Sequence, residues 1–227
     1  MRGLACVALS GLGIAGLIAL LVANTSQTGK GAPSYRPLRI GSAFDLTPAL
    51  AQGNQRWPSV AWGESVYLVV WQEGECMAGV SDTNIFAVRV SAEGKVLDSQ
   101  PIAVCNAPGF QAYPSVCFDG KHFLVAWQDY RQGKDWDVYL ARVSTDGRVL
   151  EPNGVAVASG TGNQIYPAVA SAGQQRALVV WSDLQPKTDE PEAYSLSGTL
   201  LSEGKPAGPA KVLLPAYHPK TREVKSY

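Results

Sequence analysis

The 227-residue sequence predicts an all-β fold made of three tandem four-stranded units. A motif of the form Gly-x-Gln-x-aromatic-Pro occurs three times, at 53–58, 109–114 and 162–167. An apolar run that ends in tryptophan follows each copy. The 23 glycines and 15 prolines supply many turns, and no segment after Ala23 shows helical periodicity. These observations favour many short strands.

The three copies keep a nearly constant period. Their prolines are 56 and 53 residues apart, and the tryptophans that end the apolar runs are 56 and 54 apart. A fixed period of this length indicates a repeat architecture, here with repeats at 53–108, 109–161 and 162–214. We expect the motif to join successive units, with its proline opening the first strand and its aromatic packed at the seam. The repeated residues are Pro58, Pro114, Pro167, Trp71, Trp127 and Trp181.

Each unit is predicted to hold two antiparallel hairpins. In the first unit these are WPSVAW with YLVVW (57–71) and FAVRV with KVL (86–97). An acidic residue followed by glycine, as at Glu93-Gly94, suits the tight turn of the second hairpin, because glycine tolerates a positive φ. Four strands in this length approach the ~40–50 residues of a propeller blade. Three blades are fewer than the roughly four to eight that close a ring, so we expect an open or incomplete propeller.

The pattern PSVAW, YLVVW and NIFAVRVSAEGKVL resembles the repeats of bacterial extracytoplasmic proteins with PSVAFDG, YLVVW and ARVS motifs. The resemblance covers roughly residues 46–214. It implies propeller-like blades. It implies no single activity, because such folds host many unrelated functions.

The amino terminus is a separate segment. Residues 4–23 contain no charge, and as a helix these 20 residues would span about 30 Å, the thickness of a bilayer core. A signal peptide usually has a shorter apolar core of roughly 7–15 residues, so the length favours an anchor or uncleaved signal at 1–23. A linker at 24–38, a β-repeat domain at 39–215 and a tail at 216–227 follow. We expect the β-domain on the periplasmic or extracellular side.

Repeated polar residues are predicted to gather on one face of the blades. The structural interpretation has the glutamines satisfying loop backbone groups and the carboxylates pairing with arginines, as in most buried polar sites. The functional interpretation is a mouth that binds a glycan, a peptide or Ca²⁺. Tyr130 and Trp136, in an elaborate loop, form a candidate platform for a sugar or protein partner. The repeated residues of this candidate face are Gln55, Gln111, Gln164, Glu73, Asp129 and Asp183.

The cysteines favour an oxidising compartment. Cys76 and Cys105 are predicted on the same face, which suggests a disulfide. Cys117 lies within a predicted strand and is expected to be a buried thiol. A metal site is the rival for three cysteines, but the sequence has no Cys-x-x-Cys pair and only 2 histidines.

No motif names a reaction. The sequence lacks a Gly-x-Ser-x-Gly elbow, a phosphate-binding glycine loop and a His-Glu-x-x-His motif, and no cofactor is indicated. A net charge of zero without a basic cluster argues against nucleic acid as a partner. We therefore predict a non-catalytic, membrane-anchored subunit of a larger membrane or envelope complex, with protein partners and with the bilayer held through 4–23. The alternative is a secreted or tethered glycan-binding or glycosidase-related propeller protein, with a carboxylate pair such as Asp129 and Asp183.

Overall fold

Every described strand lies in one of the two compact units of the chain, the unit Ala43–Tyr227. No helix among the described residues is long and apolar enough to cross a membrane. The predicted anchor at 4–23 lies outside the described residues. The computed structural model describes residues 42–43, 53–77, 80–184, 194–218 and 223–225.

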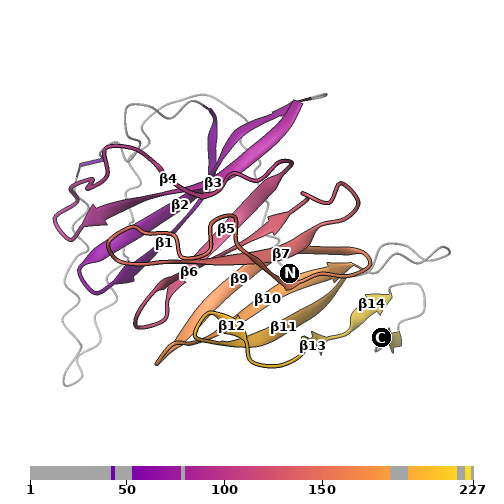
Figure 1. The fold of residues 1–227 in the computed structure, drawn as a ribbon. Helices are drawn as coiled ribbons and strands as arrows, with labels where there is room; N and C mark the ends of the chain where they lie inside the picture. Colours follow the sequence, from indigo (N-terminus) through magenta and orange to yellow (C-terminus); the bar gives the residue numbers. More distant parts are fainter. Residues whose placement is uncertain (1–41, 44–52, 78–79, 185–193, 219–222, 226–227) are drawn as a thin grey trace, which may run out of the picture. The chain divides into compact units, whose positions relative to one another are not determined.

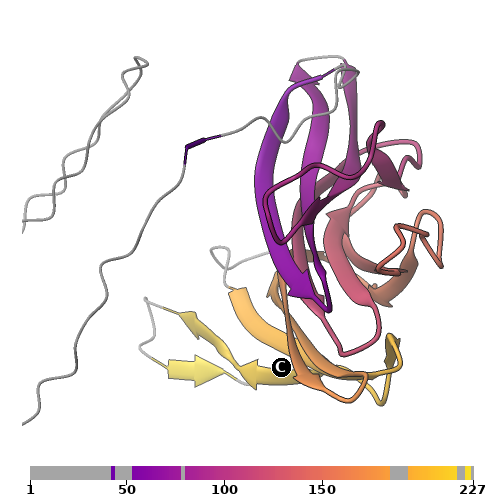
Figure 2. The same ribbon diagram turned by 90° about the vertical axis from the view of Figure 1, so that its left-hand side faces the viewer.

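The described fold is all-β and is built mainly of three antiparallel sheets in chain order, as predicted (Figure 1). The sheets follow one another from indigo through magenta to orange, and Figure 2 shows them from the side. Each is a meander in which neighbouring strands pair, so the arrangement is consistent with a partial propeller. The first sheet contains β1 (Gln55–Gly63), β2 (Val66–Met77), β3 (Val80–Ser91) and β4 (Ile102–Cys105).

The second and third sheets repeat the same order of strands. In the third, β12 and β13 both pair with β11, so they share the outer position. A short hairpin of β14 (Ala216–His218) and β15 (Glu223–Lys225) follows. The second sheet contains β5 (Gln111–Phe118), β6 (Phe123–Asp129), β7 (Asp137–Val143) and β8 (Val155–Ala158). The third contains β9 (Asn163–Gly173), β10 (Arg176–Leu184), β11 (Tyr194–Ser202), β12 (Lys205–Pro206) and β13 (Lys211–Leu214).

A β-bulge interrupts the first strand of each sheet. In β1, Trp57 and Pro58 lie opposite the single residue Trp71, where the register with β2 shifts. The same two-against-one arrangement occurs in β5 and β9. Proline suits a bulge because it has no N–H to donate to the ladder. The Gln-x-aromatic-Pro part of each motif therefore lies within the strand, and the proline lies inside the strand instead of opening it.

Apolar side chains fill the space between successive sheets. One cluster joins the first and second sheets and includes Leu68 and Val125, both fully buried. A second cluster joins the second and third sheets and includes Leu124 and Val179. Because β6 contributes alternate residues to the two clusters, the second sheet is covered on both faces.

Three kinds of hydrogen bond also join each sheet to the next. A serine hydroxyl accepts from a backbone N–H, a glutamine amide oxygen accepts from another, and an arginine donates to a backbone carbonyl. We call these the inter-sheet joints. Between the first and second sheets they are Ser59–Val116, Gln72–Tyr113 and Arg89–Thr145, at 3.3, 3.4 and 3.2 Å. Between the second and third sheets they are Ser115–Val169, Gln128–Tyr166 and Arg142–Glu203, at 3.1, 3.0 and 3.2 Å.

Candidate functional site

The three bulges place three aromatic side chains in a row. Trp57, Tyr113 and Tyr166 have φ values of 56°, 54° and 54°, in the left-handed region. This conformation is rare for bulky residues, and each of these residues also precedes a proline, which restricts it further. Backbone strain of this kind persists only where the surroundings impose it, and it clusters at functional sites. Here the fold imposes it at the same motif position in every sheet.

The aromatic rings contact one another from sheet to sheet. The ring centroids of Trp57 and Tyr113 are 4.7 Å apart, and those of Tyr113 and Tyr166 are 4.9 Å apart. Trp57 is 52% exposed and Tyr166 is 55% exposed, so these rings are not core residues. The row and its prolines line a hollow of about 230 Å³, which we call the aromatic hollow. Its lining residues are Trp57, Pro58, Tyr113, Pro114, Tyr166 and Pro167.

These aromatics are not among the candidate site residues predicted from the sequence. The repeated aromatic-proline pair predicts a packed seam. The rings do meet across the sheets, as expected. Their exposure follows from the bulge, which adds a residue and changes the alternation of side chains along the strand. Three aromatics at one motif position were the available signal.

The predicted glutamines and carboxylates pair within their own sheets. Strand register places each glutamine directly opposite the carboxylate that follows the tryptophan of the same sheet. Gln164 Nε2 donates to Asp183 Oδ1 at 3.3 Å, and Gln55 Nε2 lies 3.5 Å from Glu73 Oε2. The cross-strand pairs are Gln55 with Glu73, Gln111 with Asp129, and Gln164 with Asp183.

Several of these groups are engaged inside the protein. Glu73 is buried and accepts from Trp71 Nε1 at 3.0 Å. Gln111 is fully buried and donates to the carbonyl of Pro108 at 3.4 Å, although its Oε1 has no partner among the described residues. This placement resembles the structural interpretation more than an open polar mouth.

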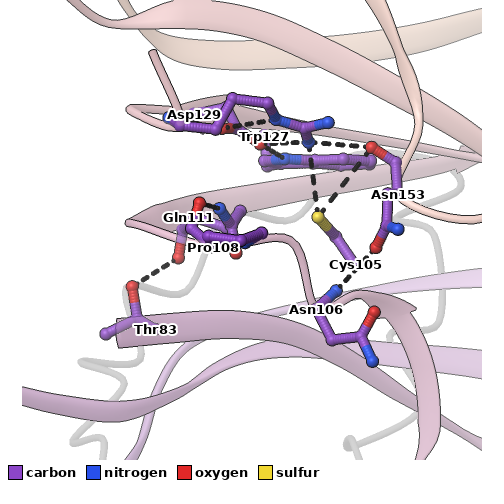
Figure 3. Close-up of polar contacts among 9 residues, drawn as sticks. Thr83, Cys105, Asn106, Pro108, Gln111, Trp127, Asp129 and Asn153 are labelled. Carbon is purple, nitrogen blue, oxygen red and sulfur yellow. Dashed lines mark hydrogen bonds and ion pairs between the residues drawn. The ribbon is translucent and has the colours of Figure 1, made fainter. Parts of the chain in front are cut away.

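Asp129 accepts hydrogen bonds on both of its carboxylate oxygens (Figure 3). Its Oδ2 accepts from Trp127 Nε1 at 2.9 Å and from Arg131 Nη2 at 2.5 Å, and its Oδ1 accepts from the Arg131 backbone N–H and Nε at 2.9 Å. The guanidinium also donates to the carbonyl of Asn153 at 2.8 Å and lies 3.9 Å from the ring centroid of Tyr139. A carboxylate held on both oxygens by a stacked arginine orders the loop after β6.

The predicted disulfide between Cys76 and Cys105 is not supported, because Cys105 is a free, buried thiol. Cys76 lies opposite Ser81 and Cys105 lies opposite Ile85. Ser81 and Ile85 are four residue steps apart, which corresponds to about 13 Å along β3, whereas disulfides need Cα atoms within about 7 Å. The hairpin of β2 and β3 is longer than its counterparts, which carries Cys76 away. Cys105 Sγ instead lies 3.4 Å from Arg131 Nη2 (Figure 3).

The loop containing the predicted platform also binds the next sheet. Tyr130 and Trp136 do come together, with ring centroids 5.2 Å apart. Trp136 is half-buried, and its ring lies 6.1 Å from that of Phe110. Its backbone N–H donates to Asn163 Oδ1 at 3.1 Å, and its carbonyl accepts from Gln164 N at 2.7 Å.

One further buried carboxyl, that of Asp137, has a raised pKa. Burial, and secondly the charge of Asp135, raise the pKa of Asp137 above its usual value. Asp137 lies opposite Asp129 in the register of β6 and β7, and its Oδ1 has no partner among the described residues. No cluster of three or more His, Cys, Asp or Glu side chains in the described ranges could hold a metal ion.

The sequence matches no known family profile and no curated protein. In fold it resembles a thermostable family-43 glycoside hydrolase, with a TM-score of 0.51 and 8% identity over 75% of this chain and 56% of that chain. An endo-arabinase from Bacteroides thetaiotaomicron matches with a TM-score of 0.46 and 15% identity, over 73% of this chain and 64% of that one. A xylan beta-1,4-xylosidase from Bacillus halodurans matches with a TM-score of 0.47 and 18% identity, over 74% and 32%. This chain spans less than two thirds of each protein.

These comparisons correct two predictions. The main functional prediction, a non-catalytic subunit of a larger complex, is wrong, because the fold is that of a family-43 glycoside hydrolase. The prediction that the chain is not an enzyme, which rested on the lack of a catalytic motif, is contradicted by the same likeness. The findings favour the alternative, a glycosidase-related propeller. At this identity the likeness shows the fold alone, so it transfers no activity or residue role.

Proposed function

We propose that this chain is a glycosidase-related propeller protein that binds a neutral glycan at the aromatic hollow. The observation that carries the proposal is the row of exposed aromatic rings that three bulges hold in strained backbone conformations. The fold likeness to glycoside hydrolases supports the same class of ligand.

The chemistry of the hollow suits a sugar ring. Trp and Tyr combine a large apolar face with a polar edge, and they contribute contact area with little loss of conformational freedom. The C–H faces of a pyranose or furanose ring pack against such surfaces. No charged side chain is among the lining residues. A glycan bearing carboxylates or sulfates therefore finds no ion-pair partner there, which favours an uncharged ligand.

A glycan array followed by calorimetry tests the proposal. We expect binding to neutral glycans, and we expect Tyr166→Ala and Trp57→Ala each to weaken binding about tenfold or more, which corresponds to about 1.4 kcal/mol. Tyr67→Ala is the matched control, because Tyr67 is also an exposed aromatic but its ring contacts that of Trp62 outside the hollow. Binding that survives both hollow substitutions, or a preference for acidic glycans, contradicts the proposal.

The same protein shows whether the bound glycan is cleaved. Incubation with the bound glycan, followed by measurement of new reducing ends, separates hydrolysis from binding alone. A carboxyl that acts as a general acid needs a raised pKa, and Asp137 is a described carboxyl with this property. If cleavage occurs, Asp137→Asn is the first substitution to examine.

We also propose that residues 4–23 tether the β-domain to a bilayer on the periplasmic or extracellular side. The uncharged run of 20 residues supports this. Membrane fractions washed with alkaline carbonate test it: a protein released by the wash is not anchored. The predicted protein partners stay a prediction.

A further inference from the structure

We propose that Gln72 and Gln128 are positioning residues for the aromatic hollow, each holding the aromatic ring of the following sheet. This inference rests on the proposed function. Each glutamine directly follows the buried tryptophan of its own sheet, and each reaches across to the next sheet.

The hydrogen bonds run to the strained residues themselves. Gln72 Oε1 accepts from the backbone N–H of Tyr113 at 3.4 Å, and Gln128 Oε1 accepts from that of Tyr166 at 3.0 Å. The glutamines are 7% and 4% exposed, so these bonds are shielded from water. Since a backbone N–H can only donate, the atom facing it must be the amide oxygen.

A bulge makes such a partner necessary. Two residues oppose one across the bulge, which leaves the extra residue outside the regular ladder. A buried backbone N–H without a partner is costly, so native proteins supply one. Here the partner comes from the preceding sheet. The φ value that directs each tyrosine ring into the hollow therefore depends on a side chain from another sheet.

The first ring provides an internal comparison. Trp57 has the same conformation, with a φ of 56°, but no sheet precedes it among the described residues. In the third sheet the position after Trp181 is Ser182, which is too short to reproduce the glutamine. The two glutamines therefore act only at the two described junctions between sheets.

Three variants at the second junction separate positioning from general stability. Gln128→Met keeps the length of the side chain but removes the acceptor, and we expect it to weaken glycan binding about tenfold. Gln128→Glu replaces the amide oxygen with a carboxyl oxygen that can still accept, whether or not the carboxyl is protonated, and we expect glycan binding by this variant to stay within about threefold of the unmodified protein. Ser115→Ala is the control, because it removes another hydrogen bond between the same two sheets, from Val169 N at 3.1 Å. We expect it to lower stability while leaving glycan affinity unchanged.

A measurement without ligand keeps the inference testable on its own. For each variant, hydrogen exchange at the Tyr166 amide is measured relative to the unmodified protein. We expect this relative rate to be at least tenfold higher in Gln128→Met than in Ser115→Ala. Unchanged exchange in Gln128→Met overturns the positioning role. If Trp57→Ala and Tyr166→Ala both leave binding intact, the proposed function fails; if they weaken it and Gln128→Met leaves it intact, the positioning role alone fails.

Discussion

The second and third sheets are copies of the same sequence unit, yet they differ in the residues on the onward face, by which we mean the face that a following sheet would cover. Both keep a buried tryptophan, Trp127 or Trp181, and both present a tyrosine on a bulge. The second sheet carries all three inter-sheet joints, and the third carries none of the equivalent side chains. The replacements are Ser115 by Ala168, Gln128 by Ser182, and Arg142 by Leu200.

The onward face of the third sheet is apolar instead. Leu178 occupies the position of Leu124, three residues before the tryptophan, and it is 39% exposed whereas Leu124 is fully buried. With Leu200 and Leu213 it lines a groove of about 340 Å³. The repeat therefore conserves the residues that build each sheet, and it varies those that join one sheet to the next. Core and joint are separable parts of the unit.

The largest effect on stability is expected at the ion pair of Asp129 and Arg131 in the second sheet. Arg131→Met leaves the Asp129 carboxylate buried with its charge uncompensated, which typically costs about 3–5 kcal/mol. Arg176→Met in the third sheet is the control, because Arg176 is exposed and its hydrogen bond to Gln174 is exposed too. It should change stability by less than about 0.5 kcal/mol. Urea unfolding of both variants measures the difference, and similar costs would contradict the account of Asp129.

An intermediate effect is expected from the two buried tryptophans. Trp127 Nε1 donates to Asp129, whereas Trp181 Nε1 is buried without an acceptor among the described residues. Both replacements by phenylalanine lose similar apolar volume, but only Trp127→Phe removes a hydrogen bond to a buried charge. We therefore expect Trp127→Phe to cost about 1–3 kcal/mol more than Trp181→Phe. Thermal unfolding compares them directly, and equal losses of stability would show that the Trp127 bond contributes nothing net.

The architecture could be predicted because it depends on local and periodic signals. Fixed spacing of Pro58 and its two equivalents identifies the units, and the predicted turn at Glu93-Gly94 is present. The predicted fourth strand of the first unit, KVL, is wrong: it forms only an isolated bridge from Val96 to Val90, and the fourth strand is Ile102–Cys105. Strand alternation predicts that the glutamines and carboxylates share one face, but it does not predict that each glutamine lies opposite a carboxylate of its own sheet.

The remaining features depend on register, which the sequence does not state. A bulge of one residue at Trp57 changes which side chains face outward, and nothing in a two-residue alternation predicts it. The length of the hairpin between β2 and β3 decides that Cys76 and Cys105 lie apart. The third copy also differs by one residue around its last turn: Leu200, four residues before Gly204, lies opposite Leu178, whereas Arg142 is five residues before Gly147.

The smallest effect on stability, and the easiest to measure, concerns two thiols at the junctions. Burial raises the pKa of Cys105 to about 11 and that of Cys117 to about 12. Since the thiolate is the reactive form, both should alkylate at pH 8 at least about 100-fold more slowly in the folded protein than in urea. Peptide mass spectrometry after timed iodoacetamide treatment measures each site separately.

The raised pKa values of the two thiols determine how the stability of the fold depends on pH. Both folded pKa values lie above the usual value of 9.0 for a thiol, so burial favours the protonated form in the folded state. The stabilisation is fully present below pH 9 and is lost as the pH rises through about 11 to 12, because the unfolded chain then releases protons more readily. Cys105→Ala and Cys117→Ala should each flatten part of this decline. Rapid labelling of Cys105 at pH 8 contradicts its burial. Recovery of Cys105 in a peptide disulfide-linked to Cys76 contradicts the free thiol and restores the disulfide.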